Sequence, residues 1–150
     1  MNAVIGRANT DDLDEVLDLL REVELPVEGV AEHFSEFFIM RDAEGEGRLI
    51  GCVGQERHGN AMLLRSLAVS PSLQRSGLGR ELTRYLLDSD RSNGMDDVVL
   101  LTTTAAGFFS GHFSFKQVER SQFDDLFVDS IEWQLPRCSS AVCMHLKLSE

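Results

Sequence analysis

The sequence is poor in basic residues and has no long apolar run. It contains 14 Lys and Arg residues against 25 Asp and Glu residues, a formal net charge of −11. A field of that sign repels nucleic acids and anionic membranes, so we expect neither as a partner. No apolar stretch approaches the roughly 18 residues of a membrane-spanning helix, and no basic segment followed by an apolar one opens the chain. We therefore expect a cytoplasmic protein.

Cysteine is also scarce. The three cysteines are Cys52, Cys138 and Cys143, and none of them forms a C-x-x-C pair. An odd number of cysteines in a chain without a secretion signal indicates free thiols. The spacing of Cys138 and Cys143 is unlike that of zinc ligands, so we expect no metal site, and a two-thiol site for a soft metal or metalloid stays an alternative.

Length and composition indicate one globular domain. The chain has 150 residues, of which 43% are hydrophobic and 26% charged. These fractions are typical of a folded protein, and 150 residues are enough to bury most of the chain surface in one core. We expect a single domain over residues 1–150.

Periodicity and turn residues predict an α/β fold. Thr10 is the expected N-cap of a first helix, and Thr104 the expected N-cap of a later one. Apolar alternation predicts strands over residues 3–7, 37–41, 48–57, 61–69, 97–101, 115–119 and 143–148. Helical spacing predicts helices after Thr10 and over residues 27–34, 78–87 and 105–112, with a hairpin turn at 43–47, a stop at 92–94 and a loop or surface helix at 121–132. The expected order is β-α-α-β-β-β-α-β-α-β-β, a mixed sheet of six to seven strands with about four helices.

The loop between the strand at 61–69 and the helix at 78–87 has the features of an anion site. Gly77 and Gly79 remove side chains where the loop enters the helix, so first-turn N–H groups can point at a ligand. Arg75 and Arg80 flank the loop. This pattern predicts a diphosphate cradle, and an ordinary helix entry is the alternative.

Gln74, Gly77 and Gly79 fit the pattern Q-x-x-G-x-G, and Leu67-Ala68-Val69 ends the strand before it. Here the sequence resembles the GNAT superfamily of acetyl-CoA-dependent N-acetyltransferases, over nearly the whole chain. The resemblance implies a GNAT fold, acetyl-CoA as cosubstrate, and a loop that holds the pyrophosphate of coenzyme A while the strand backbone holds the pantetheine arm. The cofactor-binding residues implied are Leu67, Ala68, Val69, Gln74, Arg75, Ser76, Gly77, Leu78, Gly79 and Arg80, with Phe109 as a wall of the thioester site.

The sequence departs from this family at its usual catalytic positions. Leu63 stands where a glutamate base is often found, and Phe108-Phe109 stand where a tyrosine acid is often found. Phenylalanine cannot donate a proton, so the general acid and base are unknown from the sequence. Glu56, His33 and His112 are weak candidates for the base, and water is another.

Arg65 is the expected acceptor-binding residue. Strict alternation places it on one strand face with Leu63, Leu67 and Val69, an apolar setting in which an arginine needs an anion partner. That partner is either an acid of the chain or a substrate carboxylate held by the guanidinium fork.

Three short stretches are similar to those of amino-acid N-acetyltransferases, including the type encoded in arsenic-resistance operons. They are the LRSLAV strand at 64–69, the TTTA run at 102–105 and the C-x-S-A-x-C-M segment at 138–144. This resemblance implies an amino-acid-like acceptor.

The expected function is transfer of an acetyl group from acetyl-CoA to the amino group of a small amino-acid-like acceptor, by direct attack in a ternary complex. Two alternatives stay open: a non-catalytic acyl-CoA-binding or regulatory domain, suggested by the missing glutamate and tyrosine, and acetylation of a peptide amine. A homodimer is possible because exposed strand ends in this fold often pair.

Overall fold

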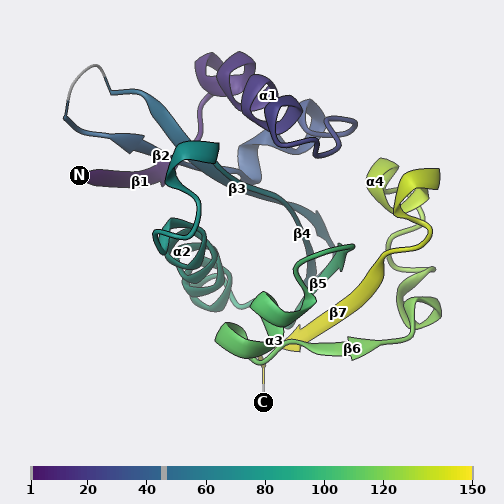
Figure 1. Ribbon diagram of the computed structural model, residues 1–150. Coiled ribbons are helices and arrows are strands. Elements are labelled where there is room, and N and C mark those ends of the chain that lie inside the picture. Colours follow the sequence, from purple (N-terminus) through teal and green to yellow (C-terminus); the bar gives the residue numbers. More distant parts are fainter. Residues whose placement is uncertain (1, 45–46, 150) are drawn as a thin grey trace.

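A seven-stranded sheet with helices on both faces forms the molecule (Figure 1). The computed structural model describes residues 2–44 and 47–149, apart from the side chain of Arg137. The strands are β1 (Ala3–Arg7), β2 (Phe38–Asp42), β3 (Leu49–His58), β4 (Ala61–Val69), β5 (Asp97–Thr102), β6 (Lys116–Val118) and β7 (Val142–Lys147). The α-helices are α1 (Leu13–Glu22), α2 (Leu78–Ser92), α3 (Ala106–Phe113) and α4 (Ile131–Gln134), and the 3₁₀ helices are η1 (Thr10–Asp12), η2 (Ala31–Glu36), η3 (Pro71–Leu73), η4 (Arg120–Phe123) and η5 (Pro136–Cys138).

The strands are arranged in the order β1-β2-β3-β4-β5-β7-β6. Neighbouring strands are antiparallel except β4 and β5, which are parallel because α2 carries the chain back to the same end of the sheet. The seven predicted strands and the mixed α/β class are confirmed, with boundaries that shift by one or two residues.

The strands β4 and β5 separate before they end. Their pairing begins at Ala61 and Asp97 and stops at Leu64 and Leu100, although β4 continues to Val69. Figure 1 shows the two strands diverging toward the end where α4 lies. Among the described strands, none therefore pairs with the last part of β4 on the β5 side.

A β-bulge at Ser66 interrupts β4. Ser66 has a φ of 61°, and the register with β3 slips by one residue between Arg65, opposite Gly54, and Ala68, opposite Cys52. Past the bulge, Leu67 and Val69 pack in the core that also holds Leu64. The prediction that they share a face with Arg65 is wrong, because strict alternation does not allow for the extra residue.

Two apolar cores lie on the two faces of the sheet. On one face α2 and α3 cover a core that includes Leu82, Leu86 and Phe109. On the other face α1 and η2 cover a core built around Val16, Leu20, Phe34, Phe37 and Cys52. On that second face α4 and the segment before it pack on β4, β5 and β7 through Trp133 and Phe127.

Two predicted N-caps are corrected. Asn9, not Thr10, caps the first helical segment, through a capping box with Asp12. The N-cap of α3 is Ala105, not Thr104. The N–H of Ala105 donates a hydrogen bond to the hydroxyl of Thr102.

Residues 27–34 do not form the predicted helix. They make turns around Gly29, which has a φ of 82°, and only then enter the 3₁₀ helix η2. The predicted helix stop at Asn93-Gly94 is confirmed, since Asn93 is the C-cap of α2. Part of the predicted turn at 43–47, Gly45-Glu46, lies outside the described residues.

Candidate functional site

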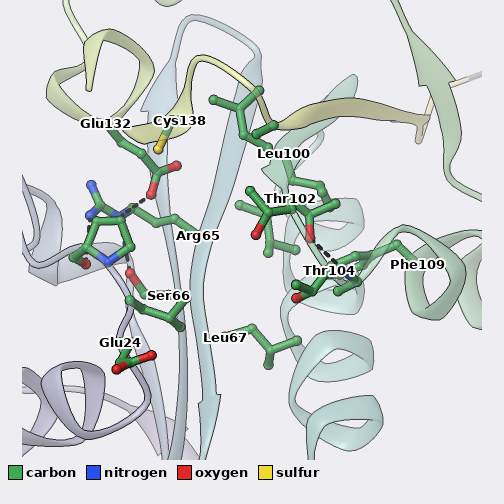
Figure 2. A pocket seen from close by; sticks show the side chains of 17 residues that line it. Glu24, Arg65, Ser66, Leu67, Leu100, Thr102, Thr104, Phe109, Glu132 and Cys138 are labelled. Atoms are coloured by element: carbon green, nitrogen blue, oxygen red, sulfur yellow. Dashed lines mark hydrogen bonds and ion pairs between the residues drawn. The ribbon is translucent and has the colours of Figure 1, made fainter. Parts of the chain in front are cut away.

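A cavity of about 290 Å³ lies where β4 and β5 diverge. The main features of its wall are two acids, an arginine, threonine hydroxyls and apolar side chains. Figure 2 labels ten of the lining residues: Glu24, Arg65, Ser66, Leu67, Leu100, Thr102, Thr104, Phe109, Glu132 and Cys138. Arg65 and Glu132 lie on one side, and Thr102, Thr104 and Phe109 on the other.

Arg65 is held by two carboxylates. Its Nη1 lies 2.8 Å from Oε2 of Glu56, and its Nε lies 3.2 Å from Oε2 of Glu132. The same guanidinium donates to the hydroxyl of Ser66 at 3.1 Å and to the carbonyl of Pro26 at 3.4 Å. Its side chain is fully buried. The sequence left two kinds of anion partner open for Arg65, an acid of the chain or a substrate carboxylate. In the structure the partners of Arg65 are acids of the chain, Glu56 and Glu132.

The two carboxylates beside Arg65 differ in their pKa. Burial raises the pKa of Glu132 to about 7; Arg65 opposes this effect and the charge of Glu56 adds to it. Burial also acts on Glu56, but hydrogen bonds from His58, Ser130 and Arg65 outweigh it and hold the Glu56 pKa below its ordinary value. Carboxyl groups whose pKa values are pushed apart in this way are typical of acid–base sites.

Glu132 is the site residue that sequence reasoning missed. It lies at the end of the stretch interpreted as a loop or surface helix, in α4, where Ser130 is the N-cap. Its neighbour Trp133 is buried, and a buried aromatic beside an acid was the available signal. The threonines at 102–104 also line the cavity. The sequence alone indicates only a stretch similar to amino-acid N-acetyltransferases and a helix cap here.

The loop at 74–80 is an exposed helix entry. Gly77 is the N-cap of α2 with a φ of 88°, and the hydroxyl of Ser76 donates to the carbonyl of Leu73. The first helical bond runs from the N–H of Glu81 to the carbonyl of Gly77, so the preceding N–H groups face outward. Gln74, Arg75, Ser76 and Arg80 are exposed, whereas Leu78 is buried in the core and Gly79 is half-buried.

The segment Leu67-Ala68-Val69 connects this loop to the cavity. It lies past the last β4–β5 pair, so its backbone groups on that side are not used by β5. One of them, the carbonyl of Val69, accepts from the side chain of Gln74 at 3.2 Å. A free strand edge of this kind can hydrogen-bond an extended ligand.

The weak base candidates lie in different places. Glu56 contacts the cavity wall through Arg65, and His33 lies beside Glu56, with 3.6 Å between Nε2 and Oε1. His112 is exposed on α3, where its ring contacts Phe108. Phe109 is almost fully buried and lines the cavity. The structure thus brings Glu56, His33 and Arg65 together and leaves His112 apart.

Within residues 2–44 and 47–149, no helix has both the length and the apolar character needed to cross a membrane.

Comparison with protein families gives one match over most of the chain. A model described as the acetyltransferase (GNAT) family matches residues 8–114. An uncharacterized N-acetyltransferase of Chlorobaculum tepidum, CT2212, is 31% identical over 98 residues, which are 65% of this chain and 60% of that protein. The matched part therefore spans about three-fifths of that relative.

Solved structures share the fold at low sequence identity. Rv2747 from Mycobacterium tuberculosis, in a complex with CoA, has a TM-score of 0.79 and 23% identity, covering 97% of this chain and 99% of that one. A GNAT-family acetyltransferase from Staphylococcus aureus also has a TM-score of 0.79, at 13% identity, covering 99% of this chain and 100% of its own. The N-acetylglutamate synthase of Neisseria gonorrhoeae, complexed with coenzyme A and N-acetyl-glutamate, has a TM-score of 0.76 and 21% identity, over 100% of this chain and 36% of the synthase.

Proposed function

Since the chain belongs to the acetyltransferase (GNAT) family, we propose that it transfers the acetyl group of acetyl-CoA to the amino group of a small amino-acid-like acceptor. The family and fold expected from the sequence are confirmed, whereas the acceptor is our proposal. The observation that carries it is the pair of carboxylates around Arg65, one ionised and one with a pKa near neutrality, in the wall of the cavity between β4 and β5.

The residues present fit coenzyme A. The outward N–H groups at the start of α2, together with Arg75 and Arg80, suit the pyrophosphate. The free edge of β4 at residues 67–69 suits the amides of the pantetheine arm. Both features lead toward the cavity wall at Phe109, where the thioester would supply the acetyl group.

Glu132 is our candidate for the general base. Acetyl transfer joins the acceptor nitrogen to the acetyl carbon and breaks the bond from that carbon to sulfur. The ammonium nitrogen loses two protons on the way to the amide: the second goes to solvent as the thiolate leaves, and the first, lost before attack, needs a base. A carboxylate with a pKa of about 7 is well matched to accept that proton near neutral pH. The departing thiolate takes a proton from solvent, because phenylalanine stands at the position of the usual tyrosine.

Arg65 acts as a positioning residue in this proposal. Its charge is already shared by Glu56 and Glu132, so a third carboxylate at the guanidinium would add negative charge to a buried cluster. The acceptor carboxylate is instead assigned to the hydroxyl groups of Thr103 and Thr104, which are exposed at the cavity. The net charge of the Glu56, Arg65 and Glu132 cluster then attracts the ammonium group of the acceptor.

A small acceptor is supported by two observations. The cavity volume of about 290 Å³ suits a molecule the size of an amino acid. The similar fold in the N-acetylglutamate synthase was solved with N-acetyl-glutamate. The stretches at 64–69, 102–105 and 138–144, which resemble amino-acid N-acetyltransferases, agree with this assignment.

The test is thiol release from acetyl-CoA in the presence of single amino acids and amino-acid analogues, from about pH 5 to pH 9. We expect turnover that rises with pH through about 7 as Glu132 ionises. Glu132→Gln keeps the side-chain shape, and we expect it to lower kcat about 100-fold or more and to remove this pH limb.

Glu119→Gln is the matched control, because Glu119 is exposed and lies just after β6. It should retain the parent kcat and pH profile. Coenzyme A binding is measured separately by calorimetry for all three proteins. Saturable binding without turnover of any amine would favour the non-catalytic alternative, and an unchanged kcat in Glu132→Gln would exclude Glu132 as the base.

A further inference from the structure

The side chains of His33, Glu56 and His58 meet on the sheet face that α1 and η2 cover. Glu56 and His58 are two residues apart on β3, so their side chains point to the same face of the sheet. The 3₁₀ helix η2 packs on β3 and adds His33. Among the residues that the structure describes, this is the one grouping of three or more His, Cys, Asp or Glu side chains with ligand atoms close enough for a metal ion.

The two imidazoles converge on one carboxylate oxygen. Nε2 of His58 lies 3.0 Å and Nε2 of His33 lies 3.6 Å from Oε1 of Glu56. The ligand atoms of the three residues all lie within 4.8 Å of one another. Ligands bound at about 2.1 Å in a tetrahedral arrangement lie about 3.4 Å apart, so small side-chain rotations produce coordination geometry here.

Neighbouring groups hold the three side chains in place. Oε2 of Glu56 is occupied by Arg65 at 2.8 Å, which leaves Oε1 directed at the histidines. The ring of His58 packs edge-on against Phe127, with 5.1 Å between the ring centroids. Support of this kind orients the ligands in many metal sites.

Burial and charge also suit a cation. The Glu56 side chain is fully buried, while the side chains of His58 and His33 are 12% and 28% exposed, so the site opens to solvent at the histidines. Arg65 also forms an ion pair with Glu132 on its other side, so its positive charge is shared between two carboxyl groups. A metal ion would therefore meet Oε1 of Glu56, the oxygen that Arg65 does not contact, and the Nε2 atoms of the two histidines.

We propose that His33, Glu56 and His58 form a binding site for a divalent transition-metal ion of the Zn²⁺ or Co²⁺ class. Two imidazoles and one carboxylate are a ligand set that such ions prefer, and three protein ligands leave a position for water. The site adjoins the acetyl-transfer cavity through the ion pair of Glu56 with Arg65, but metal binding to it does not depend on the proposed activity.

The test is calorimetric titration of the chelator-treated full chain with Zn²⁺ at about pH 7.5, where free imidazole is neutral. We expect one ion per chain with a dissociation constant in the micromolar range or below. His33→Ala and His58→Gln should each weaken binding about 100-fold or more, and Zn²⁺ should raise the unfolding temperature of the parent but not of His33→Ala.

His112→Ala is the matched control, because His112 is exposed on α3 and should leave Zn²⁺ binding unchanged. Far-UV circular dichroism verifies that each variant is folded. His33→Ala is the safer variant, because the His33 side chain is 28% exposed and that of His58 is 12% exposed. Absence of binding below about 1 mM, or equal binding by the parent and a folded His33→Ala, would overturn the proposal. A thiolate-to-metal charge-transfer band with Co²⁺ would also overturn it, since the ion would then be bound at a cysteine.

Discussion

At the scale of single residues, buried charge decides the chemistry of this molecule. Arg65 lies between Glu56 and Glu132, and its contacts together with burial give the two carboxyl groups opposite pKa shifts. A guanidinium can serve both acids because its N–H groups point in several fixed directions. Neither acid is close to Arg65 in the sequence, so the cluster exists only in the folded chain.

Another buried acid, Asp90, has a different environment. Its Oδ1 accepts a hydrogen bond from the side-chain Nε2 of Gln55 at 2.8 Å. In the described part of the chain, Oδ2 of Asp90 and the side-chain oxygen Oε1 of Gln55 lack hydrogen-bond partners. Burial raises the pKa of Asp90 from 3.8 to about 7, against the effect of the Gln55 hydrogen bond. The folded state therefore binds a proton here that the unfolded state has lost above about pH 4.

We predict that Asp90→Asn stabilises the protein above pH 7. In the parent, the contribution of Asp90 to the free energy of unfolding falls as pH rises from about 4 to about 7, and an amide avoids this loss. The new amide N–H can also donate to Gln55. Urea denaturation should show a gain of roughly 1–3 kcal/mol at about pH 8 and a smaller gain at about pH 5. An equal difference at the two pH values would contradict the assigned pKa.

At the scale of elements, glycines decide how closely strands and helices approach. Gly54 on β3 lies under the buried ring of Phe37, and a Cβ atom placed on it would be 2.1 Å from that ring. Gly6 on β1 also lies in a strand, but a Cβ there would meet no heavy atom of the described residues within 4 Å. Alanine at Gly6 therefore reports the effect of strand propensity alone, whereas alanine at Gly54 adds the effect of packing against Phe37.

We predict that Gly54→Ala lowers the free energy of unfolding by roughly 3 kcal/mol, because the fully buried ring of Phe37 would have to move. Gly6→Ala is the control, with an expected change between zero and a gain of roughly 1 kcal/mol. Urea denaturation monitored by circular dichroism measures both changes. Equal effects would mean that the Phe37 contact has little weight.

The helix entry at Gly77 gives a prediction for cofactor binding. Gly77 and Gly94 lie at opposite ends of α2 and both have positive φ angles, 88° and 73°. A Cβ atom added at either glycine would meet no heavy atom of the described chain within 4 Å. Gly77→Val and Gly94→Val should therefore cost a similar free energy of unfolding, about 1–2 kcal/mol. Only Gly77→Val should weaken coenzyme A binding, at least tenfold by calorimetry. Equal dissociation constants for the two variants would contradict the assignment of this loop to the pyrophosphate.

At the scale of the whole molecule, the net charge of −11 acts on stability. Acids outnumber basic residues 25 to 14, so like charges repel one another in the compact state. We predict that NaCl between about 0.02 and 0.3 M raises the free energy of unfolding by roughly 1 kcal/mol, because it screens this repulsion. Urea denaturation at several salt concentrations tests this, and a decrease with salt would show that screened ion pairs outweigh the repulsion.

The sequence by itself determined the order of the strands along the chain and the loop at the start of α2. The strands and helices follow from local periodicity and turn residues, and the loop follows from glycines that are close together in the chain. Local patterns failed where the chain departs from ideal geometry. The bulge at Ser66 reversed the expected face of Leu67 and Val69, and the turn at Gly29 replaced a helix.

Only the tertiary structure decided the composition of the cavity and of the histidine cluster. Glu56, Arg65 and Glu132 come from β3, β4 and α4, and His33 joins Glu56 from η2. The pKa of Glu132 depends on burial, which exists only after these elements pack together. Sequence periodicity reports which face of its own element a residue occupies, whereas the chemistry of a buried charge depends on neighbours that other elements supply.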